Sequence, residues 1–245
     1  MKNEAELITV GVLALQGSYH EHISHLNSLF EQLNENIKYN CRYKFISKEV
    51  KTAEELIGLN GLILPGGEST TISILLQRNK MLEPLRKLIQ IDKLPCWGTC
   101  AGLILLSNKI INTKIDLGGE NIEQSMKYRS IGGLDVCIER NSFGRQIDSF
   151  KKKFILHNFE GELKNSSFDC IFIRAPVIKT ITKSKSNQII EHDVKNSTVY
   201  APDLNIDKNM SREVPKVLLK INTNFNDELI VAVRQNNIFG TSFHP

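Results

Sequence analysis

The first hundred residues alternate between short, continuous apolar runs and stretches with helical periodicity. Residues 7–15 form one such run, which ends at Gln16-Gly17 and is typical of a strand buried on both faces. Ser18 is a candidate N-cap for a helix that extends to about residue 33. Further strands are predicted at 42–47, 61–64 and 95–98, and further helices at 52–57, 69–78 and 82–91. Strands and helices that alternate at this spacing predict an α/β fold around a parallel sheet.

The second half of the chain has a different pattern, with short strand candidates and few helices between them. Strands are predicted at 131–138, 154–156, 170–173, 217–221, 229–233 and 238–243. Two polar stretches, 109–130 and 183–212, have little periodicity, and the second is rich in Asn, Lys, Ser and Asp. We interpret both as insertions into a single domain that spans residues 1–245, and not as domains of their own.

The bulk properties narrow the function classes. A chain of 245 residues can bury a sizeable core, and its net charge of +4 is spread along the sequence, which argues against a dedicated nucleic-acid binder. No apolar stretch approaches the roughly 18 residues that a membrane span needs, and the polar N-terminus does not resemble a signal peptide. The five cysteines are an odd number without a C-x-x-C pair, which favours a reducing compartment over a disulfide framework. We therefore expect a cytoplasmic protein.

The segment Gly98-Thr99-Cys100-Ala101-Gly102 lies between two apolar runs and predicts a strand, a sharp turn and a helix, with Cys100 at the turn. Glycines on both sides provide the small neighbours and tolerant dihedrals that such a turn needs. A position at a helix N-terminus would lower the pKa of the Cys100 thiol and favour the nucleophilic thiolate. The alternative is a buried structural cysteine, since local cysteine signatures do not transfer well between families.

A thiolate nucleophile needs a base, and His244 is the candidate among the histidines. It follows the apolar run 238–243 and would therefore lie at the carboxyl end of a strand, the edge where open α/β sheets build their sites. The alternative is a chain-end residue without a role. His22 and His25 share a face of the first predicted helix, but no third ligand has a suitable spacing, so we expect no metal site.

A second segment that indicates a functional site is Leu64-Pro65-Gly66-Gly67-Glu68-Ser69-Thr70. Adjacent glycines between a strand and a helix expose backbone N–H groups at a helix N-terminus, which can bind an anion or an oxyanion. The lysine of a P-loop is missing from this segment. A simple turn would explain the pattern equally well.

The elbow around Cys100, the Gly66-Gly67 loop and the terminal Phe243-His244-Pro245 together resemble class I glutamine amidotransferases. Within that class, the segments 11–17, 139–146, 148–150 and 173–176 are similar to the glutaminase subunit of pyridoxal 5'-phosphate synthase. The similar segments occur in order from residue 8 to residue 245, so the resemblance covers nearly the whole chain. It implies a three-layer sandwich around a mostly parallel, flavodoxin-like sheet.

The resemblance also implies roles for individual residues. Cys100 would attack the side-chain amide of L-glutamine, and His244 would take the thiol proton and return it to the leaving ammonia. Water would then hydrolyse the resulting thioester, with the backbone N–H groups of Gly67 and Ala101 as the oxyanion hole. The glutamine-binding positions that carry over are Gly66, Gly67, Glu68, Arg140, Ile173 and Arg174. A carboxylate and guanidinium groups suit a substrate with an α-ammonium and an α-carboxylate.

The partner implied by the resemblance is the synthase (lyase) subunit of pyridoxal 5'-phosphate synthase, which would receive the ammonia internally for vitamin B6 biosynthesis. We therefore expect a hetero-oligomer without a cofactor, a metal, a nucleic acid or a membrane contact. These glutaminases are typically active only in the complex. A Gly66-Gly67 peptide whose N–H points away from the oxyanion until the partner binds would explain that dependence.

One departure from the family pattern concerns the residues after His244. The family continues His-Pro-Glu, where the Glu orients the histidine, and then forms a final helix, whereas the sequence here ends at Pro245. Three explanations stay open: a fragment or misread gene end, a weakened enzyme, or partial substitution by the terminal carboxylate of Pro245. The alternative functions are a glutaminase for the histidine or tryptophan pathway, against which 140–146 and 173–176 argue, and a non-catalytic docking partner of the same synthase.

Overall fold

The computed structural model describes residues 5–36, 42–111, 128–140, 149–157, 164–182, 192–193, 198–204, 213–222 and 228–244. Its strands are β1 (Glu6–Leu13), β2 (Tyr43–Val50), β3 (Gly61–Leu64), β4 (Cys96–Thr99), β5 (Ser107–Ile111), β6 (Leu134–Glu139), β7 (Phe150–Ile155), β8 (Ser167–Phe172), β9 (Val177–Ile181), β10 (His192–Asp193), β11 (Thr198–Tyr200), β12 (Lys216–Asn222), β13 (Glu228–Gln235) and β14 (Ile238–Thr241). Its helices are α1 (Tyr19–Glu35), α3 (Ser69–Arg78), α4 (Leu82–Gln90) and α5 (Ala101–Leu106).

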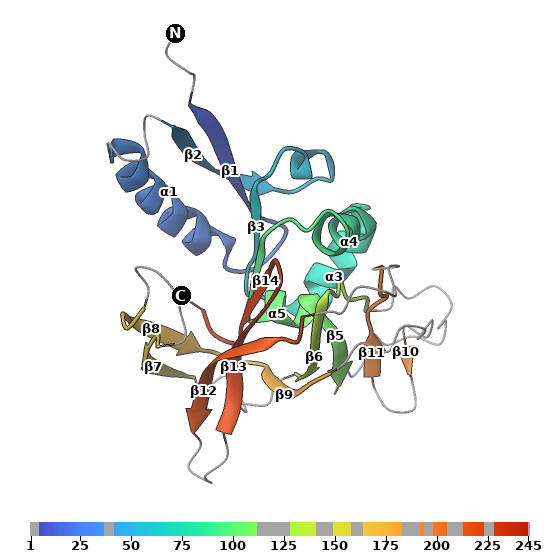
Figure 1. Cartoon of the computed structure of the whole chain (residues 1–245). Coiled ribbons are helices and arrows are strands. Elements are labelled where there is room, and N and C mark those ends of the chain that lie inside the picture. The colour runs from blue at the N-terminus through green and yellow to red at the C-terminus, as the bar shows by residue number, and fades with distance from the viewer. Residues whose placement is uncertain are drawn as a thin grey trace.

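A sheet of twelve strands runs through the molecule in the order β10-β11-β5-β6-β9-β13-β14-β4-β3-β1-β2, with β12 paired to β13 (Figure 1). The block β2-β1-β3-β4-β14 is parallel, and it is built from the continuous apolar runs of the first half together with the last strand. β13 and β9 add to this block in antiparallel fashion, as short strands without intervening helices can. The structure confirms an α/β fold with a large central sheet.

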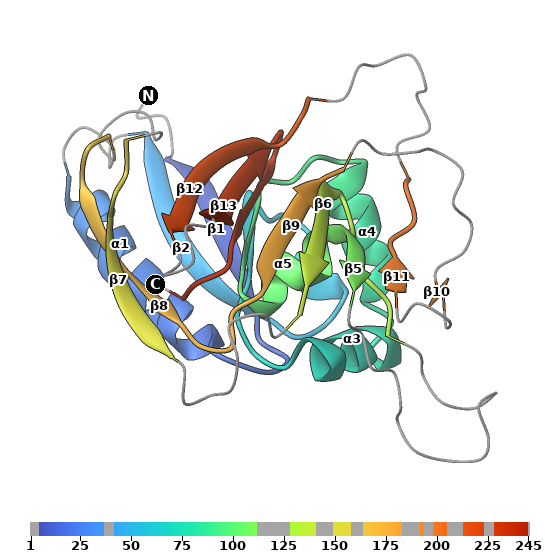
Figure 2. The ribbon, with the colours of Figure 1, turned by 90° about the horizontal axis from the view of Figure 1, so that it is seen from below.

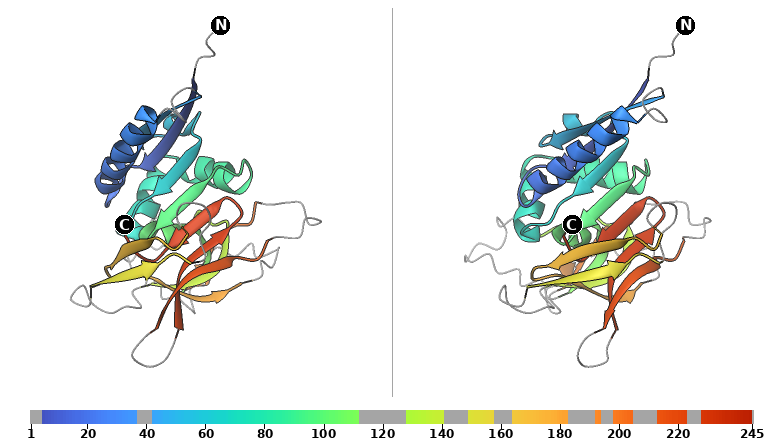
Figure 3. Two further views of the ribbon diagram at one scale, coloured as in Figure 1. Left: turned by 60° about the vertical axis from the view of Figure 1, so that its left-hand side comes forward. Right: turned by 90° about the vertical axis from the view of Figure 1, so that its left-hand side faces the viewer.

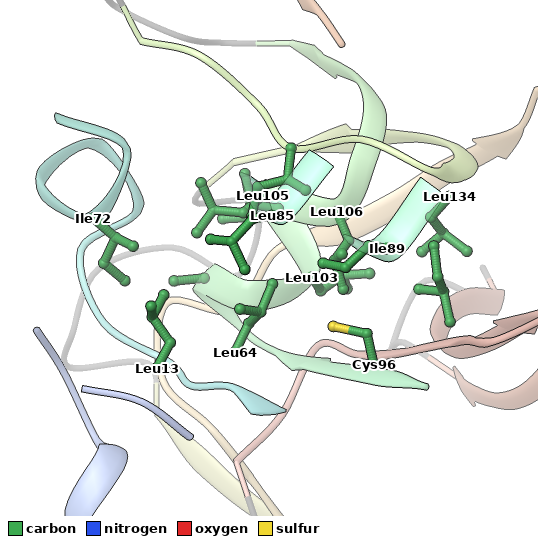
Figure 4. Close-up of a cluster of buried hydrophobic side chains, with 14 of the residues drawn as sticks. Leu13, Leu64, Ile72, Leu85, Ile89, Cys96, Leu103, Leu105, Leu106 and Leu134 are labelled. Carbon is green, nitrogen blue, oxygen red and sulfur yellow. The ribbon is translucent and has the colours of Figure 1, made fainter. Parts of the chain in front are cut away.

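Helices cover both faces of the parallel block: α1 lies on one face, and α3, α4 and α5 lie on the other (Figure 3). Successive side chains along β4 point to opposite faces of the sheet, so its residues contact either α1 or the helices on the other face. Cys96 points into the core beneath α4 and α5, where Figure 4 shows it among buried leucines. Trp97 lies on the α1 face, 5.5 Å from the ring of His22 and 5.7 Å from that of Phe239. Trp97 and Phe239 also line a depression of about 360 Å³, so α1 covers its face only in part.

β7 and β8 form a separate antiparallel hairpin beside the C-terminal end of the described chain (Figure 2). Its aromatic side chains pack against the residues that follow β14: Phe172 lies edge-on to Phe243, with 5.6 Å between the ring centroids. The backbone continues this contact, because His244 N–H donates to Ile171 at 2.9 Å and Ile171 N–H donates to His244 at 3.2 Å. The hairpin therefore fixes the main chain of His244.

Several predicted elements differ from the observed ones. The helix predicted at 52–57 is a single 3₁₀ turn at Glu54–Leu56. The polar stretches are partly sheet, since β5 extends into 109–130 and β11 within 183–212 pairs with β5. The remainder of both stretches, Cys41, residues 141–148 and Pro245 lie outside the described residues. Among the helices that the structure describes, none has the length and apolar character needed to cross a bilayer.

Candidate active site

Cys100 lies at the carboxyl end of β4, at the N-cap position of α5, as the sequence pattern predicts. Its backbone has φ 49° and ψ −101°, a conformation that non-glycine residues rarely adopt. The turn is held from the neighbouring strand, because the Cys100 N–H donates to the carbonyl of Thr241 on β14 at 2.8 Å. A strained backbone fixed by its surroundings is typical of a nucleophile elbow.

The two glycines of the elbow are required by close packing. A Cβ on Gly102 would lie 2.1 Å from the backbone oxygen of Leu64 at the end of β3. A Cβ on Gly98 would lie 2.6 Å from the backbone carbonyl carbon of Gly102. The first turn of α5 therefore packs directly on the ends of β3 and β4, which brings Cys100 close to the loop that follows β3.

The thiol of Cys100 is buried, with 7% of the residue exposed. Burial raises the pKa of the Cys100 thiol to about 11, and the N–H of Ala101, which points at the sulfur, offsets only part of this effect. The prediction that the helix N-terminus would lower this pKa is therefore wrong, because α5 has six residues and desolvation dominates. The thiol is therefore protonated near neutral pH in this structure, and a nucleophilic role for it would need a base.

His244 follows β14 on the side of β4 opposite to β3, and its imidazole reaches across to the loop after β3. A Cβ on Gly66 would lie 2.0 Å from Cε1 of His244, so the imidazole packs on the Gly66 backbone. Burial lowers the pKa of His244, and the charge of the Glu21 carboxylate opposes this shift without cancelling it. The imidazole is consequently neutral near pH 7, the form that can accept a proton. Among the hydrogen bonds of the described residues, none joins it to the Cys100 thiol.

The loop Pro65-Gly66-Gly67-Glu68 is clamped by the residues between β1 and α1. Ser18 N–H donates to the Gly66 carbonyl at 2.9 Å, and the Gln16 side-chain oxygen accepts from Glu68 N–H at 2.9 Å. A Cβ on Gly67 would lie 2.5 Å from that Gln16 oxygen. The C=O and N–H of one trans peptide point in opposite directions, so the bond to Ser18 fixes where the Gly67 N–H points. The sequence pattern does not single out Gln16 or Ser18 as a site residue; the feature that could have indicated them is their position just after the first apolar run.

Glu68 and Arg140 meet at the N-terminus of α3. The Glu68 carboxylate accepts hydrogen bonds from the backbone N–H groups of Thr70 at 3.1 Å and Thr71 at 2.6 Å. Arg140 donates to the same carboxylate at 3.1 Å and lies over the ring of Tyr128. Partial burial alone would raise the pKa of Glu68, but these hydrogen bonds and the guanidinium outweigh it and lower that pKa. The two candidate charges thus pair with each other and flank the Gly66-Gly67 loop.

Ile173 and Arg174 follow β8 and are both exposed, and Arg174 has a positive φ of 44°. The bridge between Ile171 and His244 brings them to the same edge as His244. All the candidate site residues therefore come from segments that end at the carboxyl edge of the parallel block or lie beside it.

His22 is not arranged as a metal ligand. It is 2% exposed, its Nε2 lies 3.2 Å from the Thr99 hydroxyl, and its ring packs edge-on to Trp97, whereas His25 is exposed. In the part of the chain that the structure describes, no three His, Cys, Asp or Glu side chains cluster as metal ligands would. His22 instead packs against β4, the strand that precedes Cys100.

Acidification is expected to destabilise the fold through His22. Burial lowers the pKa of His22 from 6.5 to about 4, with the nearby His244 and His25 adding to the shift and Glu21 opposing it. Between these two pH values the unfolded state binds a proton that the folded state does not, so the free energy of unfolding falls as the pH drops, by on the order of 3 kcal/mol.

Denaturant unfolding of the wild type and of His22→Gln, measured from neutral pH down to about pH 4.5, checks this prediction. The glutamine amide can keep the hydrogen bond to Thr99 but does not titrate. The variant should therefore lose less stability than the wild type across this range. Equal losses in the two proteins would show that His22 does not carry the effect.

A comparison with known protein families identifies the family of this chain. Residues 12–201, which include the elbow and the Gly66-Gly67 loop, match the SNO glutamine amidotransferase family. This chain is an SNO glutamine amidotransferase. The resemblance drawn from the sequence motifs is thereby confirmed.

Relatives of this SNO glutamine amidotransferase match it over nearly its full length. A probable pyridoxal 5'-phosphate synthase subunit pdx2 of Dictyostelium discoideum is 36% identical, with 99% of this chain and 88% of that protein covered. A pyridoxal 5'-phosphate synthase subunit PdxT of Corynebacterium jeikeium is 32% identical, with 96% and 88% covered. A crystal structure of a glutamine amidotransferase superposes with a TM-score of 0.63 at 31% identity, covering 96% of this chain and 89% of the other. Sequence and fold therefore point to the same family.

Proposed function

We propose that this chain is the glutaminase subunit of a pyridoxal 5'-phosphate synthase, which hydrolyses L-glutamine to glutamate and ammonia and passes the ammonia to the synthase subunit. The observation that carries the proposal is the strained elbow at Cys100, with the Gly66-Gly67 loop on one side and His244 reaching over from the other. The names of the relatives support the choice of synthase. The free, buried cysteines among the described residues suit a reducing compartment, so we place the reaction in the cytoplasm.

The proposed mechanism gives each of these groups one role. His244 takes the proton from the Cys100 thiol, and the thiolate attacks the amide carbon of glutamine. The negative charge that develops on the amide oxygen is stabilised by the backbone N–H groups of Gly67 and Ala101. His244 then gives the proton to the leaving nitrogen, ammonia departs, and water hydrolyses the γ-glutamyl thioester. Burial disfavours the free thiolate, so the proposed step needs His244 to take the proton.

Glutamine binding is assigned to the charges beside the loop. Arg140 and Arg174 suit the α-carboxylate of the substrate, and Glu68 suits its α-ammonium group. Glu68 and Arg140 are ion-paired in this structure, so binding would exchange part of that pair for contacts with the substrate. Ile173 and the backbone of Gly66 would complete the walls of the site.

A non-catalytic docking partner of the same synthase is the second candidate. Two observations favour it: the raised pKa of the Cys100 thiol, and the lack of a hydrogen bond between that thiol and His244 among the described contacts. Catalytic hydrogen bonds often tighten only when substrate or a partner binds, so these observations describe the isolated chain.

Reconstitution with a pyridoxal 5'-phosphate synthase subunit separates the two candidates. With glutamine as the nitrogen source, release of glutamate and formation of pyridoxal 5'-phosphate should both require this chain. With an ammonium salt as the nitrogen source, the synthase subunit should form the product without it. A chain that binds the synthase subunit but releases no glutamate would establish the non-catalytic role.

Alanine at position 66 is expected to lower the glutaminase rate without unfolding the protein. The added Cβ would meet the His244 ring at 2.0 Å, and the side chain, not the backbone, would move. Displacing a catalytic base by about 1 Å can cost about 10²-fold in rate, so we expect a loss of that order in kcat. Gly61→Ala, at the start of the strand that precedes this loop, is the control, since its Cβ would meet nothing closer than 3.8 Å. A Gly66→Ala enzyme as active as the Gly61→Ala enzyme would show that His244 does not work from this position.

A further inference from the structure

Ser18 occupies the N-cap position of α1 but does not cap the helix. Its backbone has φ −84° and ψ 45°, and its side chain accepts no hydrogen bond from a helix N–H. A serine at this position ordinarily accepts such a bond from the second or third helical residue. The hydroxyl of Ser18 is therefore directed elsewhere.

The Ser18 hydroxyl lies between the two halves of the proposed catalytic machinery. Its Oγ is 3.3 Å from the carbonyl oxygen of Gly66 and 3.4 Å from Nδ1 of His244, both at the long end of hydrogen-bond distances. Ser18 N–H donates to the same Gly66 carbonyl at 2.9 Å, which holds the serine in place. One side chain thus contacts both the candidate base and the candidate oxyanion loop.

The chemistry of these three groups sets the direction of each hydrogen bond. A carbonyl oxygen only accepts, so when both contacts are hydrogen bonds the single hydroxyl proton of Ser18 goes to Gly66. Ser18 Oγ can then only accept from the imidazole, which requires the proton of neutral His244 to be on Nδ1. In that tautomer Nε2 carries the free lone pair.

We propose that Ser18 is a positioning residue for His244, which holds the imidazole with its proton on Nδ1 and leaves Nε2 as the basic atom. This inference rests on the proposed glutaminase function for its kinetic consequence. In the first step the Sγ–H bond of Cys100 breaks and an Nε2–H bond forms, while the sulfur electron pair attacks the amide carbon. In the second step Nε2 gives that proton to the departing nitrogen as the C–N bond breaks, and Ser18 keeps its own proton throughout.

The other described groups around His244 do not compete with Ser18 for this role. Among the described side chains, the Ser18 hydroxyl is the hydrogen-bond partner that the imidazole has. The His22 imidazole is engaged with Thr99, and the exposed Glu21 acts on His244 through its charge without a hydrogen bond. The backbone bridge to Ile171 fixes the main chain of His244 but does not select a ring tautomer.

The tautomer can be measured directly and without turnover. Long-range ¹H–¹⁵N spectra of the histidine-labelled chain, assigned with His244→Gln, distinguish a proton on Nδ1 from one on Nε2. We expect the Nδ1–H form in the wild type, a shift toward the Nε2–H form in Ser18→Ala, and the wild-type form in Ser18→Thr. An Nε2–H form in the wild type, or an unchanged spectrum in Ser18→Ala, would overturn the proposal.

Kinetics in the reconstituted complex test the consequence. Ser18→Ala should lower kcat by about 10-fold to 10²-fold with little change in KM, and Ser18→Thr should restore most of the rate. Ser24→Ala, an exposed serine on the same helix, is the matched control and should behave as the wild type. A raised KM with an unchanged kcat would assign Ser18 to glutamine binding and overturn the proposal. If the wild type itself releases no glutamate, the glutaminase proposal fails, and the tautomer measurement still decides the role of Ser18.

Discussion

Cys100→Ala is expected to abolish glutamine hydrolysis in the complex with the synthase subunit, lowering the rate by at least about 10³-fold. The side chain supplies the atom that forms the thioester, and no other described thiol lies on the elbow. Alanine can occupy the site sterically, since it is smaller than cysteine and the backbone is held by the bond to Thr241. Glutamate release measured at saturating glutamine gives the loss, and co-purification with the synthase subunit shows whether docking is kept.

Cys137→Ala is the matched control for this prediction. Cys137 is also buried, but it lies on β6, which β9 and β13 separate from β14 in the sheet. The same truncation there removes a thiol without touching the elbow, so glutaminase activity should stay near the wild-type rate. Equal rates in the Cys100→Ala protein and the wild type would refute the nucleophile assignment, whatever the state of the fold.

The sequence predicted the elbow and the loop because their chemistry is local. Glycines at 98 and 102 are needed where backbone atoms approach closely, and glycines at 66 and 67 are needed where the side chains of His244 and Gln16 pack on the loop. The strands of the parallel block could also be predicted, because their continuous apolar runs are visible in the sequence alone. These features decided the fold class and most of the candidate site.

The features that sequence reasoning missed depend on how distant segments pack. The contact between Ser18 and His244 joins residues that are 226 positions apart, so no pattern along the chain could reveal it. The pKa of the Cys100 thiol was predicted in the wrong direction because the motif shows the helix N-terminus but not the degree of burial. β11 was missed because a strand of three residues inside a polar stretch carries almost no periodicity.

Gly102→Ala is expected to be the most destabilising substitution at the elbow. Its Cβ would lie 2.1 Å from the backbone oxygen of Leu64 and 2.8 Å from the carbonyl carbon of the same residue. Neither atom can move without shifting β3, which pairs with both β1 and β4. We expect a loss of about 3 kcal/mol in the free energy of unfolding and a drop in Tm on the order of 10 °C.

Gly240→Ala is the comparison variant, because its added Cβ would clash with a side chain and not with the backbone. Its Cβ would lie 2.5 Å from Cδ1 of Leu103, the far end of a side chain that can change rotamer, so the loss should be clearly smaller. Thermal unfolding of the two variants should therefore rank Gly102→Ala below Gly240→Ala, and both below the wild type. A Gly102→Ala protein as stable as Gly240→Ala would mean that α5 can lift from β3. In that case the positive φ of Cys100 would not be imposed by packing, and the elbow would lose its structural basis.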